Sequence, residues 1–235
     1  MNGEGDVALW DSVWRDHWYS KNALRTRRAG QKAACIRDPI LRILTSNQAH
    51  VCEIGCGSGH FLKAVSDFLP PQTRFYGCDQ SASAIRLARQ TTSEVPNVAL
   101  SVCDAGATPF PSGIFDAVFA VCVLEHVEDK GRVLEEMRRI CRIGGYLILF
   151  YSSRHSAFRL ERVLKSSLRS WKFGYQDELS ARQVLELFRS NFSSKGHGTL
   201  QGDWDFPLLR SVDFLISLFA ADWGRYQYYL LERVS

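Results

Sequence analysis

Between residues 50 and 151, short apolar segments alternate with amphipathic segments, and this alternation constrains the fold more than any other feature of the chain. Near-continuous apolar strands separated by helices form parallel sheets that are covered on both faces. The predicted fold is therefore an α/β, doubly wound sheet. The expected strands are 50–54, 74–79, 98–104, 115–124 and 144–151, and the expected helices between them are 59–68, 81–91 and 130–142.

The first expected strand leads into a glycine-rich turn, in the sequence VCEIGCGSGHFL (51–62). Such a turn lies at the carboxyl ends of the strands, where its backbone can approach a ligand closely. A nicotinamide or flavin fingerprint reads G-x-G-x-x-G, whereas here the position of the third glycine is occupied by His60. Glu53 directly precedes the turn and would repel a pyrophosphate but favour an ammonium or sulfonium group. We therefore expect a cationic ligand, and a tight turn without a ligand is the alternative.

Two further acids follow the next two strands. Asp79 ends the second strand, where a carboxylate can accept hydrogen bonds from both hydroxyls of a ribose. Asp104, followed by Ala105, ends the third strand and is expected to accept from an exocyclic amine such as adenine N6. A cationic group, a ribose and an adenine together indicate S-adenosylmethionine.

Four segments in this order resemble successive motifs of the class I S-adenosylmethionine-dependent methyltransferases, and in particular their small-molecule, type 11-like members. They are VCEIGCGSGHFL, YGCDQSASAIRLAR, CDAGATPFPSGIFDAVFAVCVLEHVED and GGYLILF, and the match covers roughly residues 48–152. The resemblance implies a Rossmann-like sheet of seven strands whose last strand is antiparallel. It also implies methyl transfer to a nucleophile held above the strand ends.

The resemblance also implies which residues bind the cofactor. Glu53 would lie near the methionine amino group, and the carboxylate of Asp79 would accept the ribose hydroxyls. The full set of implied cofactor-binding residues is Glu53, Gly55, Cys56, Gly57, Gly59, Asp79, Gln80, Ser81, Asp104, Ala105, Cys122 and Val123.

Two histidines are candidates for a general base. His126 follows the fourth strand by a few residues, and His155 lies just beyond the fifth strand. Imidazole titrates near neutral pH. A base is needed only if the acceptor is protonated at working pH, because the sulfonium is already an activated leaving group. His126 is equally interpretable as a helix cap. No pair of histidines has the spacing of metal ligands, so no metal site is expected.

The regions outside the alternating segment are expected to form the acceptor pocket. Residues 1–45 are an N-terminal helical arm with Trp10, Trp14 and Trp18 on one face, either packed on the sheet or acting as a lid. Residues 46–235 are the cofactor-binding domain, with pocket insertions at about 152–224. The pocket candidates are Trp10, Trp14, Arg154, His155, Phe158, Trp171, Tyr175, Trp204 and Phe206.

Three elements are expected in the C-terminal part. The segment 154–172 is expected to be a basic amphipathic helix, whose charged face would be solvated, bind an acidic substrate or contact an anionic membrane surface. Residues 180–189 and 206–221 are expected to be helices, and 226–234 a closing strand.

The charge, the motifs and the cysteine content argue against several other kinds of acceptor, metal site and cellular location. The net charge of +4 does not require a nucleic-acid partner, and the segment VCVLEHV lacks the Asn/Asp-Pro-Pro-Tyr motif of relatives that methylate nucleic-acid amines. We therefore expect no nucleic-acid acceptor. The seven cysteines are an odd number, which favours a reducing compartment over a set of disulfides. The third position of an iron–sulfur triad that would begin at Cys52 and Cys56 falls on Gly59, so no iron–sulfur cluster is expected. With neither a signal sequence nor a long apolar segment, the protein is expected to be cytoplasmic.

The predicted function is methyl transfer from S-adenosylmethionine to an oxygen or nitrogen of a small molecule, such as a secondary metabolite or a lipid-like or acidic compound. A regulatory module that binds the cofactor without catalysis is one alternative. A nicotinamide-dependent oxidoreductase is another, disfavoured by Glu53 and by His60 at the position of the third glycine.

Overall fold

The computed structural model describes residues 4–17, 22–46, 48–156, 158–168, 175–177, 180–188, 191–200, 211, 214–216, 220 and 223–235. The N-terminal helices are α1 (Glu4–His17) and α2 (Asn22–Ile43). The alternating region contains β1 (His50–Ile54), α3 (His60–Ser66), β2 (Arg74–Asp79), α4 (Ala82–Thr91), β3 (Val98–Val102), β4 (Phe115–Val121), the short 3₁₀ helix η2 (Leu124–His126), α5 (Lys130–Ile140) and β5 (Cys141–Ser152). The C-terminal part contains α6 (Phe158–Ser167), α7 (Ala181–Phe188), β6 (Phe192–Leu200) and β7 (Tyr226–Arg233).

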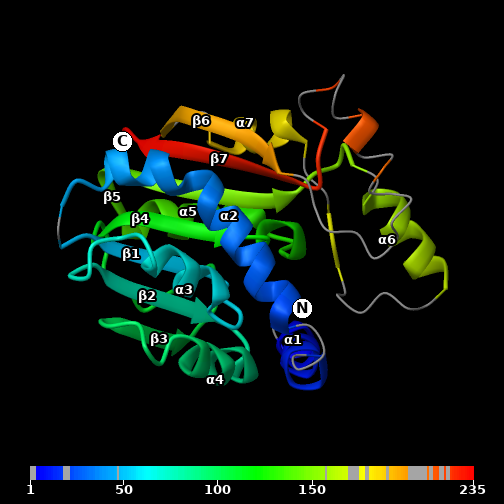
Figure 1. The fold of residues 1–235 in the computed structure, drawn as a ribbon, viewed down its shortest axis with the longest axis horizontal. Coiled ribbons are helices and arrows are strands. Elements are labelled where there is room, and N and C mark those ends of the chain that lie inside the picture. The colour runs from blue at the N-terminus through cyan, green and yellow to red at the C-terminus, as the bar shows by residue number, and fades with distance from the viewer. Residues whose placement is uncertain are drawn as a thin grey trace.

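The strands form one seven-stranded sheet in the order β3-β2-β1-β4-β5-β7-β6 (Figure 1). The first five of these strands are parallel to one another, whereas β7 lies antiparallel between β5 and β6. The strand order therefore reverses between β1 and β4, and this reversal opens a crevice at the carboxyl ends of those two strands. The predicted seven-stranded, doubly wound sheet with an antiparallel last strand is confirmed.

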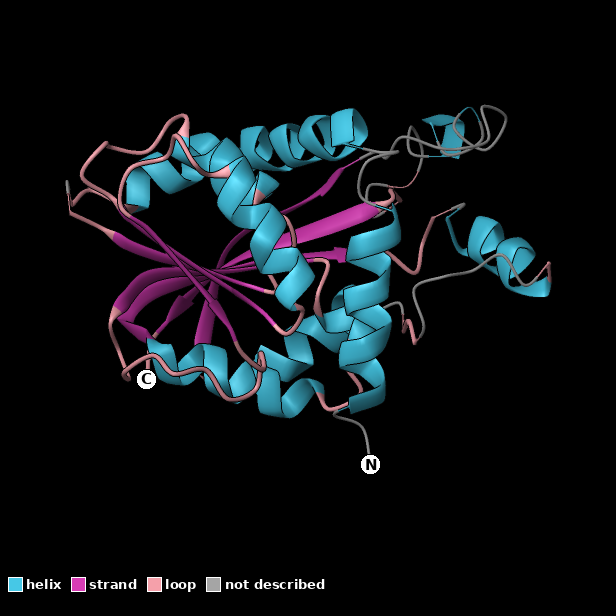
Figure 2. Ribbon diagram, turned by 90° about the horizontal axis from the view of Figure 1, so that it is seen from below, coloured by secondary structure: helices cyan, strands magenta, loops and turns pink. Residues whose placement is uncertain are grey.

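Helices cover both faces of the sheet, as Figure 2 shows. On one face, apolar side chains of α2, α3 and α4 pack on the sheet, among them Ile36, Leu62 and Ile85. On the other face, α5 and α7 pack on the sheet through residues such as Met137 and Val184. The central strands are buried on both sides, which explains their near-continuous apolar sequence.

The structure differs from the sequence predictions mainly at the sheet edges and in the arm. Strand β6 was not predicted, because its sequence FSSKGHGTL is polar and contains two glycines, as an edge strand tolerates. The N-terminal arm consists of two helices, α1 and α2. The predicted helix 206–221 lies mostly outside the described residues. Among the described residues, no helix is long and apolar enough to cross a membrane.

Candidate functional site

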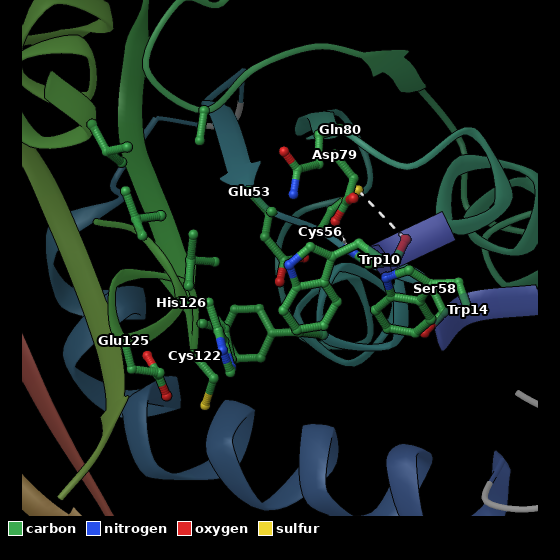
Figure 3. A pocket seen from close by; sticks show the side chains of 18 of the residues that line it. Trp10, Trp14, Glu53, Cys56, Ser58, Asp79, Gln80, Cys122, Glu125 and His126 are labelled. Atoms are coloured by element: carbon green, nitrogen blue, oxygen red, sulfur yellow. Dashed lines mark hydrogen bonds between the residues drawn. The ribbon is translucent and has the colours of Figure 1, made fainter. Parts of the chain in front are cut away.

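A cavity of about 890 Å³ opens at the carboxyl ends of β1, β2 and β4, in the crevice where the strand order reverses. Its walls come from the glycine turn after β1, the residues that follow β2, β3 and β4, and helices α1 and α2. Figure 3 shows Glu53, Asp79 and Gln80 near one another, with Trp10 and Trp14 across from them and Cys122, Glu125 and His126 at the other end. The volume lies in the upper part of the range for ligand pockets, roughly 300–1,000 Å³.

The glycine turn has a left-handed backbone at each of its glycines, and two of them have distinct roles. Gly57 has a φ of 51°, and a Cβ added there would lie 2.6 Å from the indole ring of Trp14. Gly59 has a φ of 75°, and a Cβ there would lie 3.2 Å from the backbone of Ala88 on α4. Gly57 therefore keeps the cavity wall open under α1, whereas Gly59 allows α3 and α4 to pack closely and does not line the cavity.

Glu53 is a buried acid, and one of its carboxylate oxygens faces no donor in the described part of the chain. Its side chain is 2% exposed and lines the cavity, and its Oε2 has no hydrogen-bond partner among the described residues. Burial raises the pKa of Glu53 well above its usual value, although the backbone N–H of Leu62 favours the ionised form. A cationic group in the cavity would supply both the missing donor and the missing charge.

Replacing Glu53 with Gln is expected to stabilise the ligand-free protein at alkaline pH. Because burial raises the pKa in the folded state, the folded protein binds a proton that the unfolded chain releases above 4.5, and the stability of the wild type falls as pH rises from there. Gln keeps the acceptor for Leu62 and carries no charge. We expect a stabilisation of about 1 kcal/mol, or roughly 2–4 °C in melting temperature, near pH 8.

Thermal unfolding of both proteins between about pH 5 and pH 8 checks this expectation, because the difference must grow with pH. Glu94→Gln, at an exposed position, serves as the control. A difference that stays constant with pH, or that grows toward acid, would contradict the assigned burial effect.

Asp79 joins the glycine turn to the start of α4. Its Oδ2 accepts from the N–H of Gly57 at 2.9 Å, and its Oδ1 accepts from the N–H of Ser81 at 2.9 Å. Asp79 lines the cavity, whereas Ser81 is buried as the N-cap of α4 and does not line it. The carboxylate is thus held in a fixed orientation with lone pairs left for a ligand.

Asp104 lies on a more exposed part of the cavity rim, just after β3, the strand that pairs with β2 at Asp79. Its Oδ1 accepts from the N–H of Gly106 at 2.8 Å, and its Oδ2 pairs with Arg132 at 2.6 Å. Asp104 and Ala105 both line the cavity, as predicted from their place after β3.

The end of β4 brings Cys122 and Val123 to the cavity. Cys122 has a φ of 58°, which is rare for a residue other than glycine and common at functional turns. Burial raises the pKa of its thiol to about 12. Cys122 is therefore neutral at physiological pH, and its thiol is not an activated nucleophile.

Helix α1 covers the cavity and is fastened to α4. The Oδ1 of Asp11 accepts from Ser81 Oγ and from the N–H of Ser83, each at 2.8 Å, and the Ser83 N–H lowers the pKa of Asp11. Trp14 lies on Gly57, and the ring of Trp10 meets His126 edge-on with 4.9 Å between centroids. Two residues of the tryptophan stripe, Trp10 and Trp14, thus line the cavity.

The two candidate histidines lie in different surroundings. His126 lines the cavity, and its Nδ1 lies 3.0 Å from the carbonyl oxygen of Tyr175. A carbonyl only accepts hydrogen bonds, so Nδ1 carries the proton and Nε2 is the basic nitrogen. His155 is exposed and does not line the cavity.

Most of the predicted cofactor residues meet at this cavity. Those that line it are Glu53, Gly55, Cys56, Gly57, Asp79, Gln80, Asp104, Ala105, Cys122 and Val123, and those that do not are Gly59 and Ser81. Of the predicted acceptor residues, Trp10 and Trp14 line it and Arg154, His155 and Tyr175 do not. The other predicted acceptor residues, Trp171, Trp204, Phe206 and the side chain of Phe158, lie outside the described part of the chain, as does Trp18 of the tryptophan stripe.

Sequence reasoning missed several charged residues of the cavity, chiefly Lys32, Glu125 and Arg225. The basic residues Arg25, Arg28 and Lys32 recur at helical spacing on α2, and this pattern was a usable signal. For Glu125 and Arg225, the sequence offers no comparable sign.

Comparison with known proteins agrees with this geometry. Residues 52–149 match the family model described as a methyltransferase domain. A tRNA (carboxymethyluridine(34)-5-O)-methyltransferase of Xenopus tropicalis is 32% identical over 155 residues, which are 62% of this chain and 23% of that protein. A trans-aconitate 2-methyltransferase of Azoarcus is 32% identical over 137 residues, which are 58% of this chain and 50% of that protein.

The fold recurs in a chain of the Haloferax volcanii complex between the Trm112 methyltransferase activator and a methyltransferase. The TM-score is 0.73 and the sequence identity 19%, with 96% of this chain and 97% of that chain covered. The chain spans 23% and 50% of the lengths of the two curated relatives named above. The sheet order, the glycine turn and the family match agree with one another: residues 52–149 are similar to the methyltransferase domain of the class I S-adenosylmethionine-dependent methyltransferases.

Proposed function

We propose that this chain binds S-adenosylmethionine at the glycine turn and transfers its methyl group to a small acceptor held in the same cavity. The observation that carries the proposal is the buried Oε2 of Glu53, which has no donor among the described residues and lies in the cavity beside the turn. It fits the ammonium group of the methionyl part. The fixed carboxylate of Asp79 fits the two ribose hydroxyls.

The cofactor supplies an activated methyl group on a sulfonium, so the protein contributes mainly position. Val123 and Cys122, at the end of β4, line the cavity beside the glycine turn, where Val123 lies against Gly55. Trp10 and Trp14 line it from α1, and we expect them to shield the bound ligands from water. Residues 1–45 thus act as the lid of the cofactor-binding domain, 46–235.

A small acceptor is supported by the cover that α1 provides over the cavity and by a volume sufficient for two ligands. The expectation that nucleic acid is not an acceptor is left without support, because a relative of 32% identity is a tRNA methyltransferase. Nucleic acid is therefore the second acceptor class to be tested. A membrane contact through α6 remains a separate proposal.

The acceptor class is tested by the transfer of a radiolabelled methyl group from S-adenosylmethionine. The acceptors are carboxylic acids, phosphate monoesters, phenols and amines in one series, and total tRNA in the other. Label in a small molecule supports the proposal, and label in tRNA alone would replace it with the nucleic-acid reading. Cofactor binding without transfer to either would favour a regulatory module, and displacement of S-adenosylhomocysteine by NADH would contradict the cofactor assignment.

We propose His126, rather than His155, as the general base when the acceptor carries a proton. His126→Gln is expected to lower kcat by about 10²-fold with little change in the KM of the cofactor. His197→Gln, on the exposed side of β6, serves as the control. A loss of kcat in His155→Gln and not in His126→Gln would contradict the assignment.

A further inference from the structure

The order of the strands divides the cavity into two halves. Glu53, Asp79 and Asp104, which are proposed to hold the cofactor, stand in or just after β1, β2 and β3. The other half lies at the ends of β4 and β5 and at the start of β7, where Ser152 pairs with Tyr226. A side chain in this second half is placed to contact the acceptor rather than the cofactor.

Glu125 is a fully buried acid of the second half. It belongs to the short helix η2 after β4, and it lines the cavity. Figure 3 shows it near Cys122 and away from Asp79. Its Oε1 accepts two hydrogen bonds from Ser152, from the backbone N–H at 3.0 Å and from the Oγ at 2.9 Å. The end of β5 therefore holds the carboxyl group in one orientation.

The second oxygen of this carboxyl group lacks a donor in the described part of the chain. Glu125 Oε2 is buried and has no hydrogen-bond partner there. Nearly all buried polar side-chain atoms in folded proteins have a partner, because a buried acceptor without a donor costs free energy. Since Glu125 lines the cavity, a bound molecule can supply the missing donor.

The surroundings of Glu125 favour an uncharged donor. Lys32 lines the same cavity with a side chain that is 6% exposed, and its ammonium lies 3.9 Å from the ring centre of Tyr226. A cationic ligand in this half would be attracted by Glu125 but repelled by Lys32. An O–H group supplies the donor without a second positive charge. Beside Glu125, the rings of His126 and Trp10 offer aromatic surface to the rest of the ligand.

We infer that Glu125 selects the methyl acceptor by accepting a hydrogen bond from an uncharged O–H or N–H group, such as a hydroxyl. The inference rests on the proposed function and narrows its acceptor class. Ser152 holds one oxygen of the carboxyl group, and the acceptor donates to the other. Glu125 thereby binds and orients the acceptor, and it disfavours molecules that carry only a carboxylate or an ether at this position.

Four compounds with the same benzyl group test this preference by calorimetric titration of the S-adenosylhomocysteine-saturated protein. Benzyl alcohol carries an uncharged donor, benzyl methyl ether carries none, phenylacetate is an anion and benzylamine is a cation at neutral pH. The wild type is expected to bind the alcohol at least about tenfold more tightly than the ether, because a hydrogen bond to a carboxylate contributes about that factor. Phenylacetate and benzylamine are expected to bind more weakly than the alcohol.

Glu125→Gln is expected to remove the preference without removing the contact to β5. The amide oxygen of Gln accepts from both donors of Ser152, so the amide NH₂ takes the place of Oε2 and offers a donor to the cavity. The variant is expected to bind the alcohol and the ether about equally and to bind phenylacetate more tightly than the wild type does. Glu135→Gln, in a side chain of α5 that is 70% exposed, is the matched control and keeps the preference.

The affinity for S-adenosylhomocysteine, measured in every variant, separates the possible failures. If the wild type prefers another of the four compounds or binds none of them, or if Glu125→Gln keeps the preference for the alcohol, the inference is overturned and the proposed function stands. If folded Glu125→Gln loses S-adenosylhomocysteine binding, the carboxyl group serves the cofactor, which also overturns the inference. If the wild type does not bind S-adenosylhomocysteine, the proposed function itself fails.

Discussion

Asp79→Asn is expected to weaken the binding of S-adenosylhomocysteine by at least about a hundredfold. The carboxylate is oriented by the N–H groups of Gly57 and Ser81, and its remaining lone pairs are proposed to accept both ribose hydroxyls. Each hydrogen bond to a charged group contributes about 1.5–3 kcal/mol, and every 1.4 kcal/mol is tenfold in affinity. The amide group of Asn also turns a donor toward a backbone donor, which disturbs the turn.

Isothermal calorimetry on the folded variant measures this effect. Asp67→Asn, in a side chain that is 62% exposed and pairs with Lys63 at the end of α3, is the control and should bind as the wild type does. Wild-type affinity in Asp79→Asn would show that the ribose is not bound at this carboxylate.

Gly57→Ala is expected to abolish detectable cofactor binding, and Gly30→Ala to leave it unchanged. At Gly57, the left-handed backbone costs an alanine roughly 1–2 kcal/mol, and the new Cβ would lie 2.6 Å from the indole of Trp14. Since Trp14 cannot remain in place, we expect α1 to be displaced. The methyl side chain of the new alanine then enters the end of the cavity where the cofactor is proposed to bind. At Gly30, no atom lies within 4 Å of an added Cβ.

The two glycine variants differ in stability as well as in binding. Gly30 lies within α2, where Gly→Ala is expected to raise stability by about 0.5–1 kcal/mol. Calorimetry and thermal unfolding are measured on both variants. Equal affinity in Gly57→Ala and the wild type would contradict the position given to the cofactor, and destabilisation by Gly30→Ala would contradict the open environment of that residue.

The sequence predicts the central sheet and the cofactor side of the cavity because both follow local rules. Apolar strands such as β1 and β4 have few alternatives, and the positions of Glu53 and Asp79 are fixed by the strand ends that carry them. The polar edge strand β6 follows no such rule, since its pairing with β7 depends on contacts far away in the chain.

The acceptor side was harder to predict for the same reason. Lys32 reaches the cavity only because α2 crosses the sheet beside β1, and Arg225 only because β7 returns next to β5. Glu125 looks like an ordinary acid beside His126, and its burial depends on Ser152 at the end of β5. Each of these positions requires the tertiary fold, whereas the glycine turn does not.

The central claim, that the crevice between β1 and β4 binds S-adenosylmethionine, is tested most directly by calorimetric titration of the purified protein with S-adenosylmethionine and S-adenosylhomocysteine. Binding of one molecule per chain with a micromolar dissociation constant, unaffected by NADH, is the result that the structure predicts. No heat of binding with either compound, from protein shown to be folded, would contradict it.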